Sequence, residues 1–197
     1  SAFYNCRGLR GLTIPSSVTI IGPAVFDGCV GLRDITIPPS VLEIGSFTFN
    51  GCSGLTNVAI LSSVQYIGEG VFFGCRSLRN VVIPASAEFI SSSAFQGCSG
   101  LTNIVVPASV TWIGTSAFYG CSSLKNIALP AVVSIGPASF QSCTGLTEIY
   151  MASTLRTIGT NAFYGCSSLG NIVIPTGVTS LGSCVFYECL KLSNVTI

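Results

Sequence analysis

The sequence predicts a repeat solenoid that is mainly β, in which short coils stack to form a parallel sheet along one face. Three observations lead to this prediction. Nine of the ten cysteines recur every 23 residues, with one interval of 22, and a Phe precedes each by three residues while a Leu follows each by three. A fixed period in this range indicates units that bury their core against their neighbours. The nine cysteines are Cys6, Cys29, Cys52, Cys75, Cys98, Cys121, Cys143, Cys166 and Cys189.

The repeated unit reads LxxIxIPxSVxxIGxxAFxGCxx and runs through about eight and a half copies, so residues 1–197 form a single solenoid domain. The chain opens in the middle of a unit, and we therefore expect it to be a segment of a longer protein. The single shorter interval falls between Pro130 and Ile135, where PAVVSIG replaces PASVTWIG. We expect this loss to lie in a surface turn, because within a strand it would reverse every following side chain.

Each part of the unit has its own structural prediction. In the copy around Cys121, Ile104 and Val106 are two residues apart, which is the spacing of side chains that point to one side of a strand. Pro107 ends that strand, because proline has no amide hydrogen for the next ladder bond. The following SVxxIG segment predicts a short second strand. The AFxGC segment is too short for a stable α-helix and predicts a tight or 3₁₀ turn.

Composition excludes several classes of protein. Hydrophobic residues make up 49% of the chain, charged residues 8%, and the net charge is +1. Such a chain lacks the basic surface that nucleic-acid binding requires. Gly, Ser, Pro or Asn interrupts each apolar run well before the ~20 residues of a membrane span. We therefore expect no nucleic-acid partner and no membrane span in this segment.

The repeated cysteine has four possible roles: catalytic thiol, metal ligand, disulfide between coils, or packing residue. The chain has no His to activate a thiol, and a straight column of thiolates does not surround one metal ion. Parallel side chains in register would strain a disulfide. We favour packing, and we predict no catalytic residue, no metal site and no cofactor. Cys184 is out of phase; a bridge to Cys189, a free thiol and a bond to a partner all remain open.

The variable positions are the candidate binding surface. The outward position of the second strand holds Tyr66, Phe89 and Trp112 in three consecutive units. Exposed aromatic clusters are typical of interfaces. We predict a ligand-binding site there, with shielding of the neighbouring turn as the alternative.

Two more columns flank the first strand. One, just before its first inward residue, holds Asn57, Asn80, Asn103 and Asn126 in consecutive units. These amides either hydrogen-bond one another or face a ligand. Beside it runs a basic stripe that includes Arg10, Arg33 and Arg79, which either binds an acidic partner or is simply solvated.

The unit resembles the BspA-like, or treponemal-type, leucine-rich repeats, whose pattern LxxIxIPxxVxxIGxxAFxxC it follows over the whole chain, with Phe, Cys and Leu kept in nine copies. The resemblance implies a curved, right-handed leucine-rich-repeat solenoid without catalytic residues. It also implies an extracellular or cell-surface protein that binds a protein or glycan in adhesion. The rival hypothesis is a structural spacer or assembly subunit that self-associates through uncapped ends.

Overall fold

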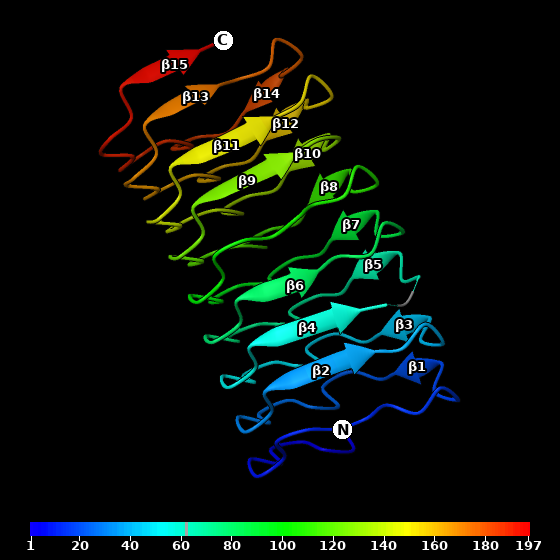
Figure 1. Cartoon of the computed structure of the whole chain (residues 1–197). Coiled ribbons are helices and arrows are strands. Elements are labelled where there is room, and N and C mark those ends of the chain that lie inside the picture. Colours follow the sequence, from blue (N-terminus) through cyan, green and yellow to red (C-terminus); the bar gives the residue numbers. More distant parts are fainter. Residues whose placement is uncertain (62) are drawn as a thin grey trace.

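A computed structural model describes residues 1–61 and 63–197 and shows a stack of similar coils that climbs from the N-terminus to the C-terminus (Figure 1). Most coils run through a strand of three or four residues on one side, a two-residue strand on the next and a turn on the third; the coil of Val105 has only an isolated bridge in place of its first strand. We call the sides that these three parts form the long-strand face, the short-strand face and the turn face. All paired strands are parallel.

The long-strand face is built from strands whose residues alternate between outside and core. Its ladder is interrupted: β2, β4 and β6 form one sheet, which a single bridge from Val82 to Val105 extends by one coil, while β9 pairs only with β11 and β13 only with β15. The strands are β2 (Asp34–Ile37), β4 (Asn57–Ile60), β6 (Asn80–Val82), β9 (Asn126–Leu129), β11 (Glu148–Met151), β13 (Asn171–Val173) and β15 (Asn194–Thr196).

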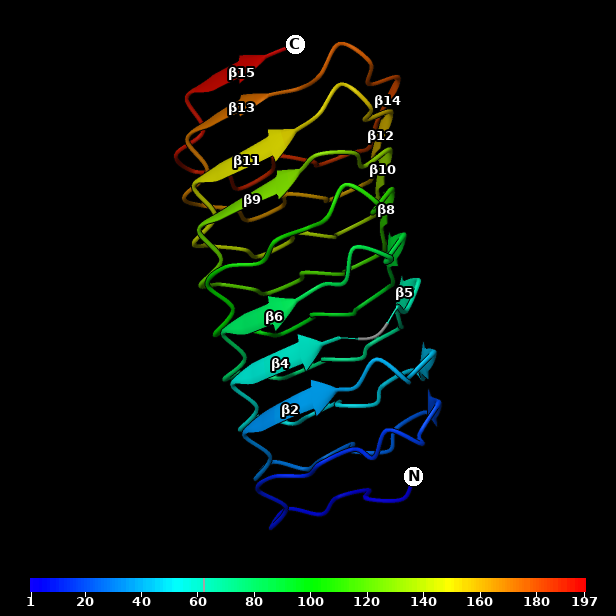
Figure 2. The ribbon, with the colours of Figure 1, turned by 45° about the vertical axis from the view of Figure 1, so that its right-hand side comes forward.

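The short-strand face lies around the corner from these strands, as Figure 2 shows. Six of its strands form one continuous sheet, and β1 pairs with β3. Ser134 pairs in register with Trp112 on one side and with Thr157 on the other. The one-residue deletion between Pro130 and Ile135 therefore lies before this strand and does not shift the pairing. The strands are β1 (Ile20–Ile21), β3 (Glu43–Ile44), β5 (Tyr66–Ile67), β7 (Phe89–Ile90), β8 (Trp112–Ile113), β10 (Ser134–Ile135), β12 (Thr157–Ile158) and β14 (Ser180–Leu181).

The turn face holds the Phe and Cys columns. All nine Phe rings stack in one file, with neighbouring centroids 5.2 to 5.7 Å apart. The chain turns through single i→i+3 hydrogen bonds, such as Cys98 N–H to the Phe95 carbonyl at 3.1 Å. These are the tight turns that AFxGC predicts, and the described residues contain no continuous 3₁₀ helix.

The repeated inward positions fill one continuous core along the solenoid axis. Coils in the middle of the stack bury their Phe, Cys and Leu completely, whereas Phe3 and Phe186 in the end coils are only partly buried. The mainly β solenoid with a parallel sheet that the sequence predicts is thus confirmed. The described part of the chain has no helix of the length and apolar character that a membrane crossing requires.

Candidate binding surface

The aromatic cluster of Tyr66, Phe89 and Trp112 lies on the outside of β5, β7 and β8. Strand pairing places Phe89 beside Tyr66 and beside Trp112. The Tyr66 and Phe89 rings stack with centroids 5.5 Å apart, and Trp112 meets Phe89 edge-on at 6.4 Å. Tyr66 is 55% exposed, and the other two are partly exposed. The structure therefore brings these three residues together as one solvent-facing surface on a paired sheet.

The asparagine column forms a hydrogen-bonded ladder over part of its length. Asn80 Nδ2 donates to Asn57 Oδ1 at 3.2 Å, and Asn57 Nδ2 donates to Asp34 Oδ1 at 2.7 Å. In the described part of the chain, Asn103 and Asn126 form no side-chain hydrogen bond of this kind. The side chains of Asn57 and Asn80 are therefore engaged in the ladder, while those of Asn103 and Asn126 face solvent.

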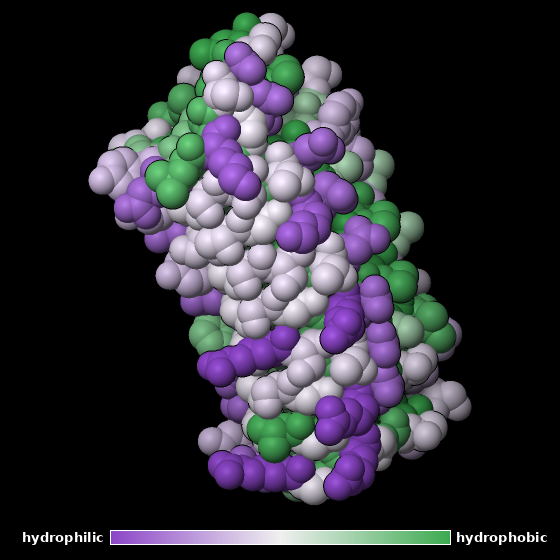
Figure 3. Space-filling view, turned by 60° about the vertical axis from the view of Figure 1, so that its left-hand side comes forward, coloured by the Kyte–Doolittle hydropathy of each residue, from purple (hydrophilic) through white to green (hydrophobic). Residues whose placement is uncertain are grey.

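The basic stripe runs along the starts of the long strands. Arg10, Arg33 and Arg79 are all exposed. Figure 3, which brings these strand starts forward, shows strongly hydrophilic side chains beside a band of hydrophobic ones at the right-hand edge. The stripe and the asparagine column share the long-strand face, so the structure separates both from the aromatic cluster.

A further exposed column on the long-strand face is absent from the sequence prediction. It occupies the outward position between the two inward residues of each long strand, and includes Val105 at 72% exposure and Tyr150 at 63%. Val82 and Val173 belong to the same column and are similarly exposed. The signal was present in the sequence as an apolar residue at an outward strand position.

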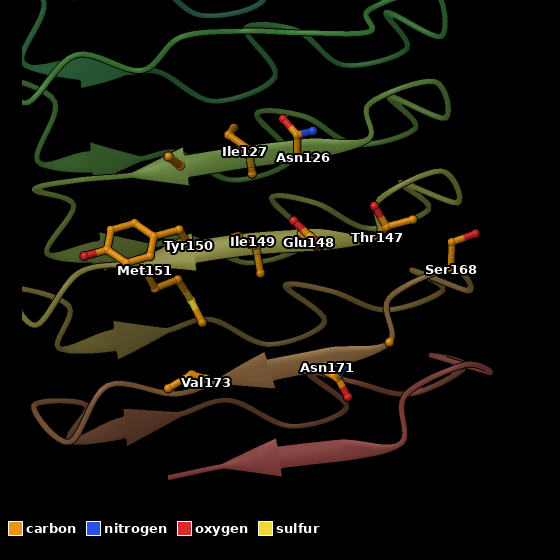
Figure 4. A pocket seen from close by; sticks show the side chains of 12 residues that line it. Asn126, Ile127, Thr147, Glu148, Ile149, Tyr150, Met151, Ser168, Asn171 and Val173 are labelled. Carbon is orange, nitrogen blue, oxygen red and sulfur yellow. The ribbon is translucent and has the colours of Figure 1, made fainter.

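A shallow hollow of about 710 Å³ lies on this face where the ladder is interrupted between β11 and β13. Figure 4 shows its lining: Thr147 and Ser168 lie at the strand starts, and Tyr150 and Val173 lie further along the strands. Glu148 lies between Asn126 and Asn171 in the neighbouring coils. The hollow therefore has a polar end and an apolar end.

Eight of the nine cysteines of the column are buried, while Cys6 in the first coil is exposed. All ten cysteines are unpaired in this structure, and Cys184 is exposed. Burial raises the pKa of the Cys52 thiol to about 12, and the neighbouring Cys29 acts in the same direction. The described residues contain no group of three His, Cys, Asp or Glu side chains arranged to hold a metal ion.

The thiols also join the coils, a role that the sequence did not reveal. Each buried Sγ donates to the carbonyl of the Phe in the preceding coil, as in Cys98 to Phe72 at 3.0 Å. The same bond recurs along the column at 3.0 to 3.2 Å. The packing interpretation is confirmed, with this hydrogen bond added to it.

The solenoid is similar in fold to solved structures of bacterial leucine-rich-repeat proteins. The leucine-rich-repeat protein of T. pallidum is 28% identical, with a TM-score of 0.66 over 92% of this chain and 77% of that one. A leucine-rich-repeat protein from Bacteroides ovatus is 24% identical, with a TM-score of 0.54 over 98% and 74%. The pneumococcal vaccine antigen PcpA is 20% identical, with a TM-score of 0.53 over 90% and 53%.

Comparison with curated proteins gave no match. The family profile described as "BspA type Leucine rich repeat region" matches in six copies, over residues 1–125 and 88–197. These two ranges together span every repeat of the stack. The chain belongs to the BspA-type leucine-rich-repeat family.

Proposed function

We propose that this chain is a non-enzymatic binding module of an extracellular or cell-surface protein, and that it captures a protein or glycan partner in adhesion. The observation that carries the proposal is the solvent-facing stack of Tyr66, Phe89 and Trp112 on adjacent paired strands. Membership of a leucine-rich-repeat family supports a protein-binding role. The extracellular or cell-surface location rests on what the resemblance of the repeat unit to the BspA-like repeats implies.

The geometry of the cluster favours binding over a packing role. Tyr and Trp are enriched among residues that dominate interface energetics. The three rings are carried by a continuous sheet rather than by a loop, so little conformational freedom is lost when a partner docks. Their inward neighbours Ile67, Ile90 and Ile113 already fill the core beneath them.

The test is a variant with Tyr66, Phe89 and Trp112 all changed to Ser, screened beside the wild type on a glycan array and a displayed peptide library. The matched control is Tyr150→Ser, which removes an exposed ring from the long-strand face. We expect the triple variant to lose the wild-type hits and the control to keep them. Equal binding by a folded triple variant would show that the cluster is not the site.

A spacer or self-assembling subunit is the competing function. It predicts association of the full-length protein at working concentrations, measurable by light scattering. Under our proposal the full-length protein is monomeric and still binds its hits. Concentration-dependent oligomers without any captured ligand would favour the spacer.

A further inference from the structure

Three of the seven acidic residues of the chain surround the aromatic cluster. Glu43 occupies the outward position of β3, the same position that Tyr66 holds in the next coil. Glu88 directly precedes Phe89 as the chain enters β7, and Glu69 follows β5 as the chain leaves it. All three are exposed. The cluster therefore has carboxylates below it and on both of its sides.

The basic residues of the chain lie elsewhere. Six of the eight stand one or four residues after a repeated cysteine, at the approach to the long-strand face: Arg7, Arg10, Arg33, Arg76, Arg79 and Lys125. On the short-strand face the basic residue is Arg156, two coils beyond Trp112. Its guanidinium is engaged, since Nη1 donates to the carbonyls of Ser153 and Leu155. The field near the aromatic cluster is therefore negative, although the net charge of the chain is +1.

We propose that the occupant of this surface is an extended protein segment that carries Arg or Lys side chains at alternate positions. The inference rests on the proposed function and names its partner class. Cations bind over aromatic faces, Arg most often, and nearby carboxylates add charge-assisted hydrogen bonds.

The spacing supports an extended segment along the solenoid axis. Side chains on one face of a strand repeat every ~6.6 Å. The ring centroids of the cluster are separated by 5.5 and 6.4 Å. The Tyr66 and Phe89 rings stack on each other, so the faces between them are covered. Alternate side chains of an extended segment can still reach successive rings, and the carboxylates of Glu43, Glu69 and Glu88 supply the charge-assisted contacts with its cations. A neutral glycan would leave the three carboxylates without a partner.

The probe is a fluorescein-labelled peptide of five Arg residues alternating with Ser, measured by fluorescence anisotropy. A peptide with Glu in place of Arg is the reference, and a Lys version compares the two cations. We expect the Arg peptide to bind most tightly and the Glu peptide not to bind. Binding should weaken between 50 and 300 mM salt, because exposed charges are screened.

Matched variants separate local charge from overall charge. The double variant Glu43→Gln with Glu88→Gln should weaken binding of the Arg peptide roughly tenfold. Each exposed ion pair contributes about a fivefold effect on affinity or less, and the variant removes two such carboxylates. Glu148→Gln with Glu188→Gln removes the same charge at distant positions and should leave affinity unchanged. Equal weakening by both pairs, or no binding by the wild type, would overturn this inference. If the array hits proved neutral and depended on the aromatic cluster, the proposed function would stand and this partner class would fall.

Discussion

The turn face and the long-strand face are built from the same 23-residue unit, yet they differ in how uniformly the coils contact one another. On the turn face the Phe rings stack without a gap through nine coils, and a thiol hydrogen bond crosses each of the eight junctions. On the long-strand face the backbone ladder is broken between Val105 and β9 and again between β11 and β13. Both faces carry a repeated column, but only one column is continuous.

This difference indicates where the stack is held together. In a solenoid each coil contacts only its neighbours, so stability is close to a sum of intrinsic and junction terms. The turn face supplies a junction term at every step, while the long-strand face tolerates breaks. Loss of contacts between coils on the turn face should therefore destabilise the fold most, and loss of contacts on the long-strand face should destabilise it least.

The largest expected effect is alkaline unfolding through the cysteine column. Burial, reinforced by the neighbouring thiols, raises the pKa of Cys52, Cys75, Cys98, Cys121, Cys143 and Cys166 from about 9. Above pH 9 the unfolded chain releases these protons and the folded chain keeps them, so stability falls as pH rises. Six thiols at ~1.4 kcal/mol per pH unit give a loss of roughly 8 kcal/mol by pH 10. Urea unfolding at pH 7, 9 and 10 measures it.

Cys98→Ala is the control for this effect. At pH 7 it should lower the free energy of unfolding by about 1–2 kcal/mol, because the bond to the Phe72 carbonyl is lost and a small cavity remains. Its pH dependence above 9 should be shallower than that of the wild type by one proton. A urea midpoint that stays constant from pH 7 to pH 10 would contradict the buried-thiol account.

Sequence periodicity was sufficient for the core and for the short-strand face. The Phe, Cys and Leu columns are identical in every unit, and stacking in register places each against its copy. The outward position of Tyr66, Phe89 and Trp112 followed from the inward position of the isoleucines that come directly after them. Position is all that this reasoning provides; binding at these residues stays a prediction.

The features that the repeat pattern did not predict are contacts between one coil and the next. The acceptor of each thiol is a carbonyl of the preceding coil, which no spacing within the unit indicates. The asparagine ladder is similar: Asn57 and Asn103 occupy equivalent positions, but only Asn57 has ladder partners. Val105 and Tyr150 stand at an outward strand position whose residue type varies from unit to unit, so the repeat pattern does not single them out.

A smaller effect is expected at Gly70 on the turn face. Gly70 has φ +56°, and a Cβ added there would collide with the ring of Phe47 from the coil below. Gly70→Ala should lower the free energy of unfolding by about 2–3 kcal/mol, since it combines left-handed strain with a clash. Urea unfolding of the purified variant measures this loss.

Two variants divide that cost into its parts. Gly74 has φ +68°, and a Cβ added there would meet the Gly51 backbone only at an ordinary contact distance of 3.9 Å, so Gly74→Ala should cost only about 1 kcal/mol of strain. In a Phe47→Ala background, Gly70→Ala should cost only that amount, because the ring is gone. If Gly70→Ala lowered the free energy of unfolding equally with and without the Phe47 ring, the clash would not be the cause.

The smallest expected effect lies on the long-strand face, in the asparagine column. Asn57 donates to Asp34 and to Thr56 Oγ1 and accepts from Asn80, so Asn57→Ala breaks three exposed hydrogen bonds and should cost about 0.5–1 kcal/mol. Asn103→Ala, at the equivalent exposed position, should change the free energy of unfolding by less than ~0.5 kcal/mol. Thermal and urea unfolding of the two variants side by side measure the difference. Equal losses would show that the ladder contributes no stability of its own, and the column would then be better explained by the amides facing a ligand.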